Sequence, residues 1–294
     1  MDPLILSFAV VNGLLQGGIY GGIALGLSLI FGVLRVVNFA HGSFLMLSLY
    51  LSFWCWSLLG MDPYLSALVT VPAMFALGYL VQRLIISPLI VRERALVVEP
   101  LSALLLTCGI FLVVDNLALM AFGPDVRSVQ LSYYMPSVML GPIPVDTPRL
   151  IAAASSIGVA VAVSMWLRYS HLGRAIRATA QNRDAAAMSG IDVPQVYAVT
   201  FGLGCAILGL FGALIAPFIP VNPQIGVAFG IKSFIVVVLG GMGSLPGSII
   251  GGLVIGVFEA VASQFVTATS AAIFSLGLFI LVLLVRPAGI MGRA

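Results

Sequence analysis

The sequence predicts an all-α membrane protein, a polytopic bundle of about eight spanning helices plus one shorter re-entrant or broken helix. Hydrophobic residues make up 61% of the 294 positions and charged residues make up 8%, whereas about 25% of a typical soluble domain is charged. The mean hydropathy is +1.18. Apolar stretches of about 20 residues, the length that crosses a bilayer, recur along the whole chain. These observations exclude a soluble globule, a disordered chain, a secreted disulfide scaffold and a nucleic-acid binder.

The apolar stretches form a single transmembrane domain over residues 1–294. The candidate spans lie near 5–31, 42–60, 64–86, 101–122, 148–167, 197–219, 248–266 and 270–285. A shorter stretch at about 228–239 has flanking glycines and is typical of a half-span or re-entrant helix. The first stretch is too long for a signal peptide, and the chain opens with Met1-Asp2-Pro3 in place of a basic segment. We therefore expect a retained helix at the start.

The arginines predict the orientation, because cytoplasmic loops accumulate Lys and Arg. Arginines gather in loop 83–99, in loop 168–196 and after the last span, at Arg286 and Arg293. Loop 123–147 carries one arginine and two aspartates and is the expected outer loop. This assignment puts the N-terminus outside and the C-terminus in the cytoplasm, provided that 228–239 crosses the membrane.

Glycines repeat every four residues in the first span. One row contains Gly13, Gly17 and Gly21, and the spacing recurs at Gly226/Gly230, Gly247/Gly251 and Gly252/Gly256. Small residues at this spacing let two helices approach closely. The rows fit ordinary close packing in a polytopic protein, and they also fit a core in which helices slide along a path; the spacing alone does not separate the two.

The inner loop 168–196 is the most informative polar segment. Asn182 can cap a helix whose first turn contains Asp184, and alanines favour its continuation. Gly190 can end that helix in a left-handed conformation, and Asp192 can cap the next helix. The segment therefore predicts a two-turn surface helix held between two membrane helices. Such a helix suits docking in a groove on a partner protein; the alternative is an amphipathic helix resting on the bilayer.

Several motifs then carry a resemblance to a known family. Asp184-Ala185-Ala186, followed after three residues by Gly190, resembles the EAA---G coupling motif of ABC importer permeases, with Asp in place of Glu. Asn38-Phe39-Ala40-His41-Gly42 resembles the NFAHG segment of branched-chain amino-acid permeases, and Arg174 lies in a run similar to the one before the family's coupling helix. Residues 238–247 resemble its VLGG-GS-PG stretch, and Glu259 follows at the matching place. The resemblance covers nearly the whole chain and is to the LivH-type subunit.

The resemblance implies a division of labour among several chains. It implies a second, LivM-type permease subunit, two cytoplasmic ATPase subunits on the coupling helices, and a periplasmic or lipid-anchored substrate-binding protein. ATP and Mg would be bound by the ATPases, and no cofactor is expected in this chain, which has no G-x-x-x-x-G-K-[ST] phosphate loop. The expected location is the bacterial inner (cytoplasmic) membrane, in contact with lipid. Branched-chain amino acids are the family's usual substrates, and other amino acids, amides, urea and aromatic acids are associated with related permeases.

Two asparagines stand beside helix interruptions. Asn38 and His41 lie where the first span ends and the second begins, and Asn222-Pro223 precedes Gly226 in the second half of the chain. Each asparagine starts an Asn-x-x-x-Gly pattern, as in an inverted repeat. Broken helices expose backbone groups that can bind a substrate's charged ends. We therefore expect Asn38, His41, Gly42, Asn222 and Pro223 to line the path or to fix the helix breaks.

Three ionisable residues lie within the predicted spans or in the shorter stretch. Asp115, Lys232 and Glu259 are expected to face a cavity or a partner, with Lys232 paired to either carboxylate. They fit an interhelical polar tie, and they also fit a proton relay in a secondary transporter, which is the rival function. No catalytic constellation and no metal site are visible: the two histidines are isolated, and the cysteines lie in apolar runs.

The outer loop 123–147 contains Pro124, Pro136, Pro142 and Pro144. It is too rich in proline for a long helix. We interpret it as a contact for the binding protein or as a passive cap over the bundle.

Overall fold

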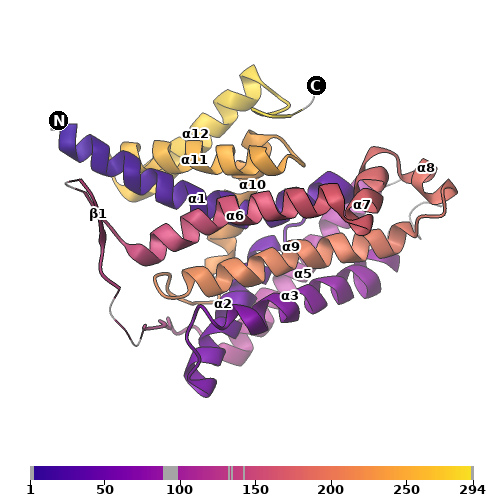
Figure 1. The fold of residues 1–294 in the computed structure, drawn as a ribbon, viewed down its shortest axis with the longest axis horizontal. Helices are drawn as coiled ribbons and strands as arrows, with labels where there is room; N and C mark the ends of the chain where they lie inside the picture. Colours follow the sequence, from indigo (N-terminus) through magenta and orange to yellow (C-terminus); the bar gives the residue numbers. More distant parts are fainter. Residues whose placement is uncertain (1–2, 89–98, 132, 134, 142, 293–294) are drawn as a thin grey trace.

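The computed structural model describes residues 3–88 and 99–292, except 132, 134 and 142. Over these residues the chain forms a helical bundle, in which α7 and α8 lie at one end and strand β1 at the other (Figure 1). We call these the coupling end and the opposite end. In chain order, the elements are α1 (Pro3–Leu34), α2 (His41–Leu59), α3 (Ala67–Val81), the π-helical turns η1 (Gln82–Ile86), α5 (Glu99–Phe122), β1 (Val138–Leu140), β2 (Ile143–Val145), α6 (Thr147–Tyr169), α7 (His171–Gln181), α8 (Arg183–Met188), α9 (Val193–Ile215), α10 (Ile225–Gly240), α11 (Leu245–Ala262) and α12 (Ala268–Val285).

Seven of the eight predicted spans are confirmed, in the predicted order, and the eighth, 270–285, corresponds to the shorter helix α12. Seven helices among the described residues are long and apolar enough to cross a membrane, and α10 and the helical residues 269–285 of α12 are shorter apolar helices. The third predicted span continues from α3 into η1. Helix α10 is the short stretch expected near 228–239. The antiparallel hairpin of β1 and β2 and the amphipathic helix α7 were not predicted.

Glycine rows bring the backbones of α1 and α11 together. A Cβ atom built on Gly17 would lie 2.6 Å from the carbonyl oxygen of Gly252, and one built on Gly13 would lie 2.6 Å from the Cα of Val257. Because position 13 meets 257 and position 17 meets 252, the two helices are antiparallel. The close-packing interpretation of these glycines is therefore confirmed, and the sliding interpretation stays a prediction.

The pair α3 and α9 repeats this antiparallel arrangement elsewhere in the bundle. Gly209 faces Thr70, whose hydroxyl donates to the Gly209 carbonyl at 2.9 Å, and Gly78 faces Cys205. Here too the contacts run antiparallel. Helices α1, α2 and α3 belong to the first half of the chain, and α9, α10 and α11 to the second. The first helix of each half packs against the third helix of the other: α1 against α11, and α9 against α3.

The direction of the helices completes the inverted arrangement. Helix α1 ends at the coupling end, where Arg35 donates to the carbonyl of Ala180 in α7. Helix α9 ends at the opposite end, where the chain continues to Val221, which pairs with Arg127 of loop 123–147. The C-terminal residues return to the coupling end, because the Met291 amide donates to the Gly240 carbonyl at the end of α10.

Candidate functional site

The chain makes the same turn before α2 and before α10. The side-chain oxygen of Asn38 accepts from the amide of Ala40 at 3.1 Å, and its carbonyl accepts from the amide of His41 at 3.3 Å. The side-chain oxygen of Asn222 accepts from Gln224 at 3.0 Å, and its carbonyl accepts from Ile225 at 3.3 Å. An asparagine that bonds the backbone two residues ahead redirects the chain into a turn. In both cases the helix begins three residues after the asparagine.

The two turns meet through glycines. A Cβ atom built on Gly42 would lie 1.9 Å from the carbonyl oxygen of Gly226 and 2.9 Å from the Cα of Gly230. Only glycine at position 42 permits this approach. The amino ends of α2 and α10 therefore meet backbone to backbone, and their partial positive charges converge on one region.

This meeting point lies deep within the bundle. The imidazole Nε2 of His41 is 3.0 Å from the carbonyl oxygen of Ile23, in the middle of α1. Ile23 precedes the end of α1 by eleven residues, which is roughly 16 Å at about 1.5 Å per residue. Asn38 and His41 thus lie beside the helix break, and the chain carries them back from the coupling end to the level of the middle of α1.

Two polar atoms at this point have no partner among the described residues. They are Nδ2 of Asn38 and Nδ1 of His41, and both side chains are buried. Buried polar groups normally have hydrogen-bond partners. The helix break therefore holds unused hydrogen-bonding capacity beside two helix amino ends, and this is the chemistry that an ionised or polar solute requires.

Asp115 lies against the first turn of α2. The hydroxyl of Ser43 donates to its carboxylate at 2.6 Å. Nearer the start of α5, the hydroxyl of Thr107 donates to the carbonyl of Val37 at 3.2 Å. Within the described part of the chain no lysine or arginine forms an ion pair with Asp115. The carboxylate is thus tied to the helix break and not to Lys232.

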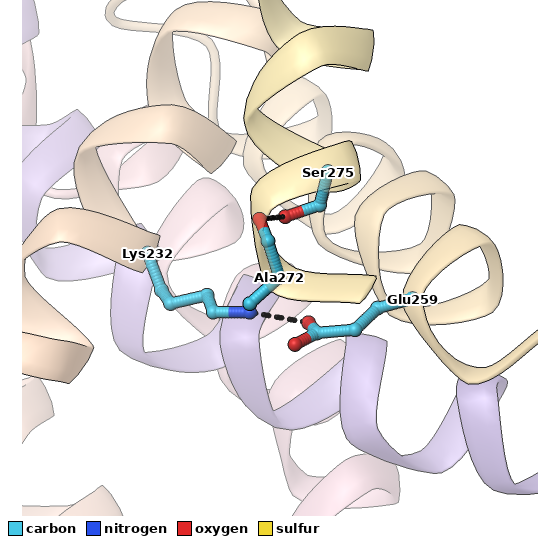
Figure 2. Close-up of polar contacts among 4 residues, drawn as sticks. All are labelled: Lys232, Glu259, Ala272 and Ser275. Atoms are coloured by element: carbon cyan, nitrogen blue, oxygen red, sulfur yellow. Dashed lines mark hydrogen bonds and ion pairs between the residues drawn. The ribbon is translucent and has the colours of Figure 1, made fainter. Parts of the chain in front are cut away.

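Lys232 pairs with Glu259, as Figure 2 shows. The pair joins α10 to α11, and about a fifth of each side chain is exposed. The ammonium of Lys232 also lies 5.1 Å from the centre of the Tyr20 ring on α1. Lys232 therefore ties three helices together, and the two charges neutralise each other within the bundle.

Loop 168–196 contains the capped short helix that its sequence predicts, but the amphipathic helix α7, and not a membrane helix, precedes it. Asn182 accepts from the amide of Ala185 at 3.0 Å and caps α8, and Asp184 lies in the first turn. Gly190 has φ of +81°, and Asp192 caps α9 by accepting from Gln195. Asp184 and Ala185 are exposed, Ala186 is buried, and Met188 is 90% exposed. A short helix thus projects between α7 and α9 with most of its surface free.

Helix α7 was missed by the sequence analysis. Its buried residues Gly173, Ile176 and Thr179 recur at every third position, which is a helical face that could have been recognised. Ser170 caps the helix by accepting from Gly173, and Arg174, on its first turn, donates to the carbonyl of Tyr169. The helix connects the end of α6 to α8.

A polytopic helical bundle in which the amino end of the short helix α10 meets the amino end of α2 inside the bundle is typical of membrane permeases. The model of the family described as "Branched-chain amino acid transport system / permease component" matches residues 9–284, and the chain belongs to that family. It is 34% identical to the high-affinity branched-chain amino acid transport system permease protein LivH of Salmonella typhimurium and to that of Escherichia coli, over 96% of this chain and 94% of each relative. It is 30% identical to BraD, the permease protein of such a system in Pseudomonas aeruginosa, over 97% of this chain and 95% of the relative. No solved structure matches significantly.

Proposed function

We propose that this chain is the LivH-type permease subunit of an ABC importer and provides the membrane path for an amino acid. The observation that carries the proposal is α8, a helix capped at its start by Asn182, followed by a glycine with positive φ, and exposed on most of its surface. An exposed helix held between the amphipathic helix α7 and the long helix α9 can transmit a push from a docked partner to the bundle.

The proposed partners supply what this chain lacks. Two ATPase subunits dock on α8 and its counterpart in a second, LivM-type permease, and they bind ATP and Mg. A periplasmic or lipid-anchored binding protein delivers the solute to the opposite end, where loop 123–147 lies. With α8 in the cytoplasm, the C-terminus is cytoplasmic and the N-terminus lies outside the inner membrane.

The proposed path passes the helix break. Asn38 and His41 supply the unpartnered polar atoms, Gly42 permits the approach of α10, and Asn222-Pro223 shapes the corresponding break. Leucine, isoleucine and valine are the proposed solutes, because LivH and BraD carry that substrate class in their names. ATP binding closes the ATPase pair, moves α8 and shifts the bundle between two open states.

Purification of the tagged chain from its native membrane in mild detergent tests this proposal. Recovery of a second permease together with ATPase subunits is expected. A chain recovered alone, or as a homodimer that remains active in ATP-free vesicles under a proton gradient, would overturn it. Such a result would favour a secondary transporter that uses Asp115, Lys232 and Glu259.

A further inference from the structure

A cavity of about 620 Å³ opens at the coupling end of the bundle. Its walls come from α1, α6, α7, the turn between α10 and α11, and the C-terminal residues Met291 and Gly292. This volume lies within the range of about 300–1,000 Å³ that small-molecule sites occupy. The cavity is separate from the helix break between α2 and α10, whose residues do not line it.

The lining of this cavity favours an anionic group. Among the described residues that line it, Arg177 carries the one charge. Its guanidinium donates to the carbonyls of Leu167 and Arg168, which fixes its position and leaves further N–H donors. Helix α11 begins beside the cavity at Leu245. Its Gly247 amide already donates to the Ser244 side chain and Pro246 has no amide hydrogen, so this helix end contributes its dipole and not free donors.

Ser28 provides an independent sign of a ligand. It lines the same cavity from α1, and its side chain is 0% exposed. Its hydroxyl has no hydrogen-bond partner among the described residues. A buried hydroxyl without a partner is costly, and a carboxylate oxygen in the cavity would satisfy it.

The wall that carries Arg177 leads directly to the docking helix. Arg177 and Ala180 of α7 line the cavity, and Asn182, which ends α7, caps α8. Arg35, just after α1, donates to the carbonyl of Ala180. A displacement of α8 would therefore reach the wall that carries Arg177, and it would move that wall relative to α1 only if the Arg35 contact breaks.

We propose that this cavity is the release site of the path, in which Ser28 and Arg177 hold the carboxylate of the transported amino acid. Movement of α8 opens it through α7. The assignment of a carboxylate-bearing solute rests on the proposed importer function, but anion binding by the cavity does not, so the two can fail separately.

Cysteine labelling of the full chain in membrane vesicles tests the proposal. Ser164 lines the cavity from α6 and is half-buried. Ser164→Cys is treated with methanethiosulfonate reagents that carry a sulfonate or a trimethylammonium group, and the modified peptide is quantified by mass spectrometry. Relative to free cysteine in solution, the ratio of sulfonate to ammonium rates should rise by about threefold or more, because a fixed cation concentrates anions near it. An unchanged or lower ratio would overturn the proposal.

Two further variants in the Ser164→Cys background identify the charge. Arg177→Gln should return the ratio to that of free cysteine, and Arg177→Lys should keep it raised. If the lysine variant is folded and shows no preference for the sulfonate, the cavity does not select anions. Ser156→Cys is the matched control, because Ser156 lies on the same helix, is 0% exposed and donates to the carbonyl of Ala153; it should remain unmodified.

A separate measurement tests whether movement of α8 opens the cavity. The labelling rate at Ser164→Cys should change by about threefold or more when the complete complex is trapped with ATP and vanadate, because α7 follows α8. Equal rates in the nucleotide-free and trapped complexes would contradict the opening mechanism.

Discussion

Gly42 and Gly226 face each other where α2 and α10 begin, so closely that a Cβ atom on Gly42 would lie 1.9 Å from the carbonyl oxygen of Gly226. Each glycine follows an asparagine turn by the same four-residue spacing. The contact is therefore the centre of an inverted arrangement in which the two halves of the chain touch at mid-depth. A motion that separates the amino ends of α2 and α10 must break this contact.

Gly42→Ala should destabilise the protein strongly. The added methyl group meets a backbone atom that cannot rotate away, so we expect a cost at the upper end of overpacking effects, about 3 kcal/mol. The amount of folded chain recovered after size-exclusion chromatography measures this. Gly158→Ala on α6 is the control, because nothing lies within 4 Å of its Cβ position, and its yield should be unchanged or higher. Equal yields for the two variants would contradict the backbone contact.

His41→Ala should lower transport more than it lowers the amount of folded protein. The imidazole contacts the Ile23 carbonyl with one nitrogen and leaves the other without a partner among the described residues. Loss of a hydrogen bond costs about 1 kcal/mol of stability, whereas loss of a path group affects every transport cycle. Uptake per folded complex in vesicles measures the difference. Parallel losses in both quantities would assign His41 a packing role alone.

Removal of one partner of the Lys232–Glu259 ion pair should lower the stability of the protein more than removal of both partners. Lys232→Met leaves the carboxylate of Glu259 within the bundle without its cation. Removal of one partner of a buried pair costs about 3–5 kcal/mol of stability. The expected loss is smaller here, because both side chains are partly exposed. The double variant Lys232→Met/Glu259→Gln should recover most of the lost thermal stability. It should also retain uptake if the pair is structural. Loss of uptake by a stable double variant would favour the proton-relay function.

Gly190→Pro should uncouple ATP hydrolysis from uptake. Gly190 has φ of +81°, and proline fixes φ near −65°. The turn after α8 must then rearrange, and α8 loses its fixed relation to α9. We expect ATP hydrolysis by the assembled complex to persist while uptake falls about tenfold or more, in keeping with the large effects of misplaced elements. Normal uptake would show that α8 is not the transmitting element.

The sequence predicted the spans, the caps of α8 and the two asparagine turns, because each depends on local composition and spacing. Asn182, Gly190 and Asp192 act within a few residues of their own positions, so their roles can be recognised without the fold. The partner of Lys232 could not be chosen, since Asp115 and Glu259 lie on different helices and only the packing of α10 on α11 decides between them. The cavity beside Arg177 was missed for the same reason, because its walls come from five separate segments.

The depth of His41 in the bundle is another feature that the sequence alone could not predict. The sequence places it between two spans, but the contact with Ile23 depends on how the connection after α1 folds back along that helix. Local patterns identify a break, and tertiary packing decides how far into the membrane it lies.

The most direct test of the central claim is uptake of radiolabelled leucine by vesicles that contain the complete complex and its binding protein. The account predicts uptake that requires ATP on the α8 side, persists in the presence of a proton ionophore, and is lost in Gly190→Pro. Uptake that proceeds without ATP and collapses with the proton gradient would contradict it.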